Sequence, residues 1–304
     1  MHHRQIAERL LESGNPAAAI EQLRKALGQD VDDAFAHALL ALCLRDTNRL
    51  FAADYEARQA LRLAPEMPTA HYVAGLVALG RRELRAAERH LNDARALDPE
   101  FVPLYRALAQ VFDETGRSRQ AEAMLREGLR LAPEDPDLLA DLGMYRLDAG
   151  KLADAEGLAR EALASDPECA MANVLMGHIL LRSGDSTGAR EHALMVLRSD
   201  ARFRPALNLL CQVKARTNPL LGLWWRYAVW MARFSDTRAM IIIVGSYVAY
   251  RLAALLLEEN GYVEATNLLT ILWLIICAYS WTGGGIFQKM LDKELKAVRL
   301  RTDF

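Results

Sequence analysis

The 304-residue chain lacks the sequence patterns by which most enzymes and cofactor-binding proteins are identified. It has no phosphate-binding glycine loop, no HExxH, no Gly-x-Ser-x-Gly and no cysteine pair at the CxxC spacing. The net charge is only −2, which argues against general nucleic-acid binding. These absences predict a protein that is not an enzyme and needs no cofactor.

Cysteine is scarce, and its spacing shows no disulfide or metal framework. Four cysteines occur without a recurring spacing, as is typical of structural thiols in a reducing compartment: Cys43, Cys169, Cys211 and Cys277. The first ten residues, MHHRQIAERL, contain no apolar run of the signal-peptide type. Both features predict a cytoplasmic location for the N-terminal part of the chain.

What the chain does contain is a fixed period. Four similar segments, ALRLAPE, ARALDPE, GLRLAPE and ALASDPE, place prolines 34 residues apart at Pro65, Pro99, Pro133 and Pro167. Because proline disrupts a helix, each segment predicts a helix end just before its proline. A period of this length indicates an array of stacked units rather than one compact core.

Three columns recur when the units are aligned on this period. Position 8 is always glycine or alanine (Ala7, Ala41, Gly75, Ala109, Gly143, Gly177), and position 20 is always alanine (Ala19, Ala53, Ala87, Ala121, Ala155, Ala189). Position 15 mostly holds residues that can end a helix in the left-handed conformation: Gly14, Asn48, Arg82, Gly116, Gly150 and Gly184. The pattern closely resembles the tetratricopeptide repeat family.

The resemblance implies an all-α solenoid of six helix-turn-helix repeats over residues 1–203. The expected repeats are 1–33, 34–67, 68–101, 102–135, 136–169 and 170–203. The apolar spacing of Leu207, Leu210 and Cys211 then predicts a capping helix over 204–216 that covers the last open face.

The resemblance also implies a groove lined by the first helix of each repeat, at positions 2, 5, 9, 12 and 13. A largely apolar groove suits a partner segment, although some of these side chains could serve only to pack neighbouring helices. Position 13 is acidic in four of six repeats, which indicates either solvation or a basic partner. The predicted partner-binding residues are Phe35, Leu42, Asp46, Tyr72, Leu76, Leu79, Arg106, Gln110, Glu114, Met144 and Asp148.

Two other kinds of site are not expected. The clamp by which some members of this family hold acidic chaperone tails needs Lys and Asn at positions 5 and 9. The first repeat has Arg4 and Glu8 there, so chaperone binding of that kind is not predicted. His37 and His71 share position 4 of successive repeats, but helices about 10 Å apart would not let them share one metal ion. No metal site is predicted.

The C-terminal third differs from the repeats in its amino-acid composition and has long apolar runs. Tryptophans beside arginines predict an interfacial amphipathic helix over 219–236. Two apolar runs, 240–257 and 268–287, predict a transmembrane hairpin, with Arg251 as the weak point of the first run. Basic flanks, including the tail 288–304, and an acidic connection over 258–267 predict cytoplasmic termini at an inner membrane. The Ala/Arg/Leu-rich usage is typical of a bacterial protein.

The sequence therefore favours a membrane-anchored scaffold that binds a partner protein through its repeats. The alternative is a subunit of a membrane complex that acts mainly through its transmembrane hairpin, with Arg251 pairing with an acid of another subunit. The lipid bilayer is an expected partner in both cases.

Overall fold

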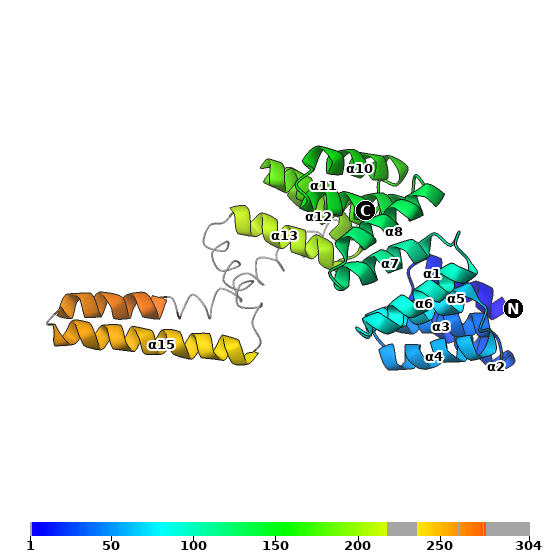
Figure 1. The fold of residues 1–304 in the computed structure, drawn as a ribbon, viewed down its shortest axis with the longest axis horizontal. Coiled ribbons are helices and arrows are strands. Elements are labelled where there is room, and N and C mark those ends of the chain that lie inside the picture. Colours follow the sequence, from blue (N-terminus) through cyan, green and yellow to red (C-terminus); the bar gives the residue numbers. More distant parts are fainter. Residues whose placement is uncertain (1, 218–235, 261, 276, 278–304) are drawn as a thin grey trace, which may run out of the picture. The chain divides into compact units, whose positions relative to one another are not determined.

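The computed structural model describes residues 2–217, 236–260, 262–275 and 277 (Figure 1). All regular secondary structure in these ranges is helical. The chain divides into two compact units, residues 1–165 and 166–304, and each is described by itself. The predicted interfacial helix up to residue 235, the end of the second predicted span and the basic tail lie outside the described residues.

The first unit contains five helical hairpins. The first helices of the hairpins are α1 (His2–Glu12), α3 (Ala34–Asp46), α5 (Pro68–Gly80), α7 (Pro103–Glu114) and α9 (Pro136–Asp148). The second helices are α2 (Pro16–Gln29), α4 (Leu50–Leu63), α6 (Leu84–Leu97), α8 (Ser118–Leu131) and α10 (Leu152–Ser165). Each second helix through α8 packs both on its own partner and on the first helix of the next hairpin, as expected of a solenoid.

The periodic residues have the structural roles that the pattern predicts. Helices α4, α6, α8 and α10 each end two residues before the proline of their segment. All six alanines at position 20 are 0% exposed. All six residues at position 15 have positive φ, between 61° and 98°, including Arg82, where a glycine would carry less strain.

Small residues at position 8 allow the two helices of a hairpin to cross closely. A Cβ atom added to Gly75 of α5 would lie 2.6 Å from Cγ of Leu91 in α6. Leu91 is itself fully buried, so the larger side chain of one helix fills the space that the glycine leaves.

In the second unit, α11 (Ala170–Ser183) and α12 (Ser186–Ser199) form a further hairpin of the same kind. Helix α13 (Arg204–Thr217) packs on both of them and buries Leu209 and Leu210 completely. The Arg216 guanidinium donates a hydrogen bond to the Leu181 carbonyl at the end of α11. Helix α13 thus lies where the capping helix is expected.

The rest of the described chain is a hairpin of a different character. Helix α15 (Asp236–Glu259) lies beside a helical segment over 263–275. The Tyr250 hydroxyl donates to Thr270 Oγ1 over 3.2 Å, and the Tyr250 and Trp273 rings stack with centroids 5.0 Å apart. Because the second helical segment already begins at 263, the acidic connection is shorter than the predicted 258–267.

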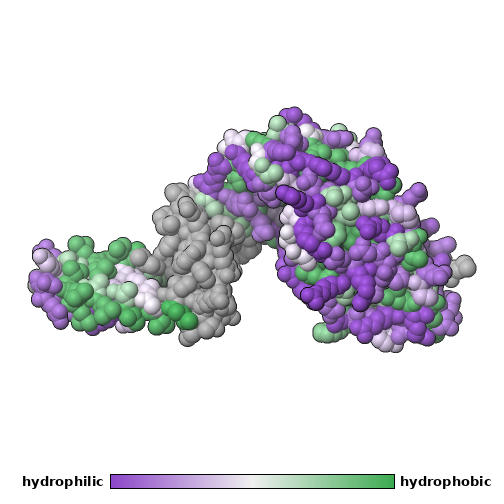
Figure 2. Space-filling view, viewed as in Figure 1, coloured by the Kyte–Doolittle hydropathy of each residue, from purple (hydrophilic) through white to green (hydrophobic). Residues whose placement is uncertain are grey.

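This C-terminal hairpin exposes many large apolar side chains, whereas the repeats present mainly hydrophilic ones (Figure 2). No helix in the described part of the chain is long and apolar enough to cross a membrane. The two predicted transmembrane helices are therefore not supported. Arg251 is exposed on α15 and interrupts its apolar run, and a charged side chain near the centre of a span costs about 2.5–3.5 kcal/mol on insertion scales.

Candidate functional site

The first helices of the hairpins in the first unit form one continuous face. Helix α1 packs on α3, α3 on α5, and α5 on α7. Polar contacts between α7 and α9 extend this arrangement, because Arg106 of α7 pairs with Asp137 and Asp141 at 2.8 and 2.7 Å. We call the surface formed by α1, α3, α5, α7 and α9 the A-helix face.

Tyr72 of α5 lies in the middle of the A-helix face. Its ring is half-buried and meets the Phe101 ring edge-on, with centroids 4.9 Å apart and an interplanar angle of 88°. The ring contacts both apolar clusters of the unit, which makes it a rigid part of the surface. Edge-to-face pairs of this kind add about 0.5–1.5 kcal/mol beyond area burial.

The Tyr72 hydroxyl lies in a charged setting. Burial raises its pKa, and the guanidinium groups of Arg45 and Arg106 act in the opposite direction. The phenol therefore remains protonated at neutral pH and can donate a hydrogen bond. It forms no hydrogen bond to any residue that the structure describes, so the donor is available to a partner.

Arg106 and its carboxylate partners form the second half of the surface. Burial raises the pKa of Asp141, although Arg106 opposes this shift. Burial and a hydrogen bond to Asp113 raise the pKa of Tyr145 in α9. The surface around α7 and α9 is consequently a network of polar contacts rather than an apolar groove.

The structure distributes the predicted partner-binding residues over three environments. Leu79 is only 6% exposed and packs in the core, so it is not available to a partner, contrary to the prediction. Seven others are half-buried: Phe35, Leu42, Tyr72, Leu76, Arg106, Glu114 and Met144. Asp46, Gln110 and Asp148 are exposed.

Two of the four acidic residues at position 13 form ion pairs within the chain. Asp46 pairs with Arg45 over 2.6 Å, and Glu114 pairs with Arg82 over 2.8 Å. Because these two carboxylates each have a cation beside them, the column presents less free negative charge than the sequence indicates. Arg45 occupies position 12, which also faces the groove. Its place directly before Asp46 in the sequence is the signal that points to the Arg45–Asp46 ion pair.

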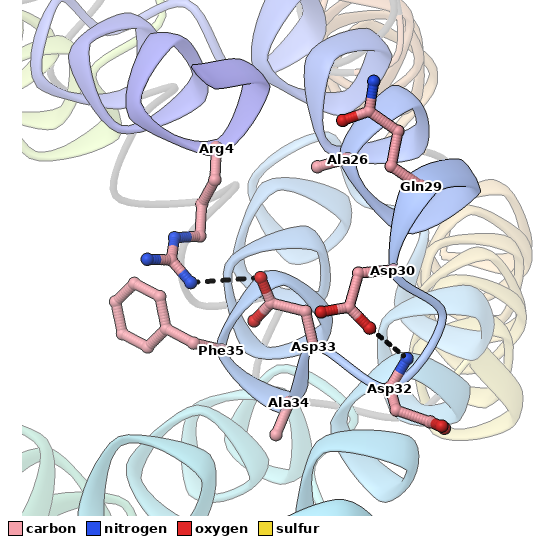
Figure 3. A pocket seen from close by; sticks show the side chains of 8 residues that line it. All are labelled: Arg4, Ala26, Gln29, Asp30, Asp32, Asp33, Ala34 and Phe35. Carbon is pink, nitrogen blue, oxygen red and sulfur yellow. Dashed lines mark hydrogen bonds and ion pairs between the residues drawn. The ribbon is translucent and has the colours of Figure 1, made fainter. Parts of the chain in front are cut away.

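A pocket of about 380 Å³ opens at the N-terminal end of the unit (Figure 3). Arg4 of α1 reaches across it, donates to Asp33 over 3.0 Å and lies 5.5 Å from the centre of the Phe35 ring. Asp33 also caps α3 by accepting from the Ala36 amide over 3.0 Å. Of the predicted residues only Phe35 lines this pocket, and the aspartates Asp30 and Asp32 complete its rim.

In comparisons with known proteins, family models match the repeat region of the chain. A family model described as tetratricopeptide repeat matches residues 4–68 and 140–202, and a second model with the same description matches 78–142. No curated protein matches the chain.

Several solved structures have a similar fold. A thermophilic tetratricopeptide repeat protein of Thermus thermophilus is 22% identical with a TM-score of 0.55, over 59% of this chain and 98% of that one. PilF of Pseudomonas aeruginosa is 21% identical with a TM-score of 0.53, over 69% and 96%. PilW, described as a widely conserved type IV pilus biogenesis factor, is 20% identical with a TM-score of 0.54, over 68% and 96%. At these identities the likeness concerns the fold alone.

Proposed function

Because the chain belongs to the tetratricopeptide repeat family, we propose that it is a non-enzymatic scaffold whose A-helix face binds a segment of a partner protein. Solenoids of this kind bury a core through stacking and leave an extended face open for contact. The observation that carries the proposal is Tyr72, a half-buried aromatic residue held in place by Phe101 at the centre of the face.

Tyr72 and Leu76 are the proposed anchors for the partner. They lie one turn apart on α5, and both remain half-buried rather than fully covered. An aromatic side chain offers a large contact area with few rotatable bonds, and such residues dominate binding energies in many interfaces. Arg45 and Arg106, which influence the Tyr72 hydroxyl, form the polar rim around these anchors.

The partner is proposed to offer apolar side chains to Tyr72 and Leu76. A basic partner would have to compete with Arg45 and Arg82 for Asp46 and Glu114, since both carboxylates are already paired. Charge reversal of Asp46, Glu114 and Asp148 to lysine separates the two cases. The reversal should strongly reduce the affinity for a basic partner and change the salt dependence of that binding. The affinity for an uncharged partner should remain almost unchanged.

The test is affinity purification with the full chain, followed by binding measurements with the recovered partner. Tyr72→Ala should weaken binding by about 2 kcal/mol, roughly thirtyfold, with little change in the melting temperature. Arg126→Ala is the matched control, because Arg126 lies on a second helix and is 59% exposed in its side chain. Normal binding by Tyr72→Ala together with loss in Arg126→Ala would move the interface to the opposite face.

A second contact is proposed for the C-terminal hairpin, with a lipid bilayer at the cytoplasmic face of the inner membrane. The exposed side chains of Ile241, Leu252, Leu256, Leu272 and Ile275 support it, since soluble surfaces rarely hold so many together. Flotation of the full chain with lipid vesicles tests the association, and deletion of 236–304 should abolish it. A cysteine placed at Asn260, at the end of α15, would label from outside the cell only if the hairpin crosses the bilayer.

A further inference from the structure

One hydrogen bond recurs at the fourth position of the repeats. The side chain there bonds to the backbone carbonyl six residues earlier, in the turn after the preceding second helix. The four examples are His37 to Val31 (3.0 Å), His71 to Pro65 (2.8 Å), Tyr105 to Pro99 (2.6 Å) and Asn173 to Pro167 (3.0 Å). A carbonyl oxygen can only accept, so the Nε2 atom of His71 carries the proton. The Nδ1 atom of a neutral His71 therefore has a free lone pair.

A second contact recurs between this residue and the side chain 19 residues later on the second helix. It is a hydrogen bond in three repeats: His3 to Gln22 (2.9 Å), His37 to Glu56 (2.6 Å) and Asn173 to His192 (2.9 Å). In the third repeat the two residues are His71 and His90. Their Nδ1 atoms are both buried and have no hydrogen-bond partner.

A carboxylate completes this group. Asp93 lies one turn after His90 on α6, and its Oδ2 atom is 3.7 Å from His71 Nδ1, too far for a hydrogen bond. One ligand atom from each of His71, His90 and Asp93 lies within 4.8 Å of the other two. Asp93 is exposed, so the group is open to solvent on one side.

We propose that His71, His90 and Asp93 form a binding site for a divalent transition-metal ion of the Zn²⁺ class. Two imidazole nitrogens and a carboxylate oxygen are the ligands that such ions prefer. Tetrahedral zinc with bonds of about 2.0–2.2 Å places its ligand atoms about 3.4 Å apart, so small side-chain rotations bring the three into range. The solvent side leaves the fourth position to water.

The surroundings of the site favour metal binding. The bond from His71 Nε2 to the Pro65 carbonyl fixes the ring and directs Nδ1 toward the site, as outer hydrogen bonds do for metal-bound histidines.

The other repeats supply substitutions that remove the ligands without breaking the hydrogen bonds. His71→Asn recreates the Asn173 and His192 pair of the α11–α12 hairpin. There the asparagine amide forms hydrogen bonds with both the Pro167 carbonyl and the histidine ring. His90→Gln recreates the His3 and Gln22 pair of the first hairpin. Both variants should fold, which circular dichroism checks before binding is measured.

The experiment is a titration of the chelator-treated full chain with ZnCl₂, followed by calorimetry, with Co²⁺ absorption as a report on coordination. One ion per chain should bind, and His71→Asn and His90→Gln should each weaken binding by about 100-fold or more. Asp93→Asn should have a smaller effect. His37→Asn, at the equivalent position one repeat earlier, should bind like the wild type.

Zinc should also raise the melting temperature of the wild type and not that of His71→Asn. Absence of stoichiometric binding in the wild type would overturn the proposal. So would unchanged affinity in both His71→Asn and His90→Gln. Loss of binding in His37→Asn with retention in His71→Asn would place the ion at the second repeat instead.

Discussion

The repeats and the C-terminal hairpin are built from the same motif, two antiparallel helices joined by a short turn, but they treat apolar side chains in opposite ways. In the repeats Leu91 and Leu125 are covered by their own hairpin and by the next helix. In the C-terminal hairpin Leu252, Leu256 and Leu272 remain exposed. A helical pair has two faces and can bury only one internally, so the repetition of the unit provides the second cover.

The largest effect should come from truncating one leucine in each region. Leu125→Ala removes a side chain that is 1% exposed and should cost about 2–5 kcal/mol, because a cavity remains. Leu256→Ala removes one that is 60% exposed and should change stability by less than about 0.5 kcal/mol. Urea unfolding of the two variants measures the difference. Equal losses would mean that the hairpin is covered in solution.

An intermediate effect is expected where two repeat helices cross. Ala121→Leu adds three carbon atoms at a site that is 0% exposed and should cost about 1–3 kcal/mol by overpacking. Arg119, two residues earlier and exposed, is the control and should tolerate alanine within about 0.5 kcal/mol. Glu122 is a poorer control, because it pairs with Arg126 and Arg146. Similar thermal melts for both variants would show that the repeat register is wrong.

A smaller, pH-dependent effect should appear at Glu88. Two hydrogen bonds from the Arg117 guanidinium, at 2.9 and 2.6 Å, hold the pKa of Glu88 below its usual value. A lowered folded-state pKa means that the stabilisation is complete above the usual carboxyl pKa and is lost as the pH falls through the folded value. Glu88→Gln should therefore melt below the wild type at pH 7, with the gap closing toward acidic pH.

The control for this measurement lies at the end of the C-terminal hairpin. Glu258 is exposed at the end of α15, so Glu258→Gln should melt like the wild type at every pH. A gap between wild type and Glu88→Gln that is independent of pH would exclude the ion pair as its cause.

The last prediction concerns the reactivity of the four cysteines and requires no substitution. Burial raises the pKa of Cys43 to about 12 and of Cys211 to about 11, and Cys169 is also buried. Cys277 is exposed. Mass spectrometry after brief iodoacetamide treatment should find one rapidly modified cysteine, and lipid vesicles should slow it if the hairpin enters them. Rapid alkylation of Cys43 in the folded chain would contradict the burial.

The repeat register predicts which positions lie on the A-helix face, but not how deeply each side chain is buried or what it contacts. Tyr72 and Leu76 are partly exposed in the structure, and their role in binding stays a prediction, whereas Leu79 of the same helix is buried. Helical spacing alone does not distinguish an inner position from a core position, because the distinction depends on how far the next helix extends. The pairing of Asp46 with Arg45 likewise depends on side-chain conformations.

The sequence by itself determined the repeat fold. Proline, alanine and left-handed positions at a fixed period act locally, through backbone geometry and close helix crossings, so they can be recognised without knowing what lies nearby. The group of His71, His90 and Asp93 was decided only by the tertiary structure. Its members belong to two helices. The site is recognised because the pairs equivalent to His71 and His90 in other repeats form a hydrogen bond, whereas His71 and His90 do not.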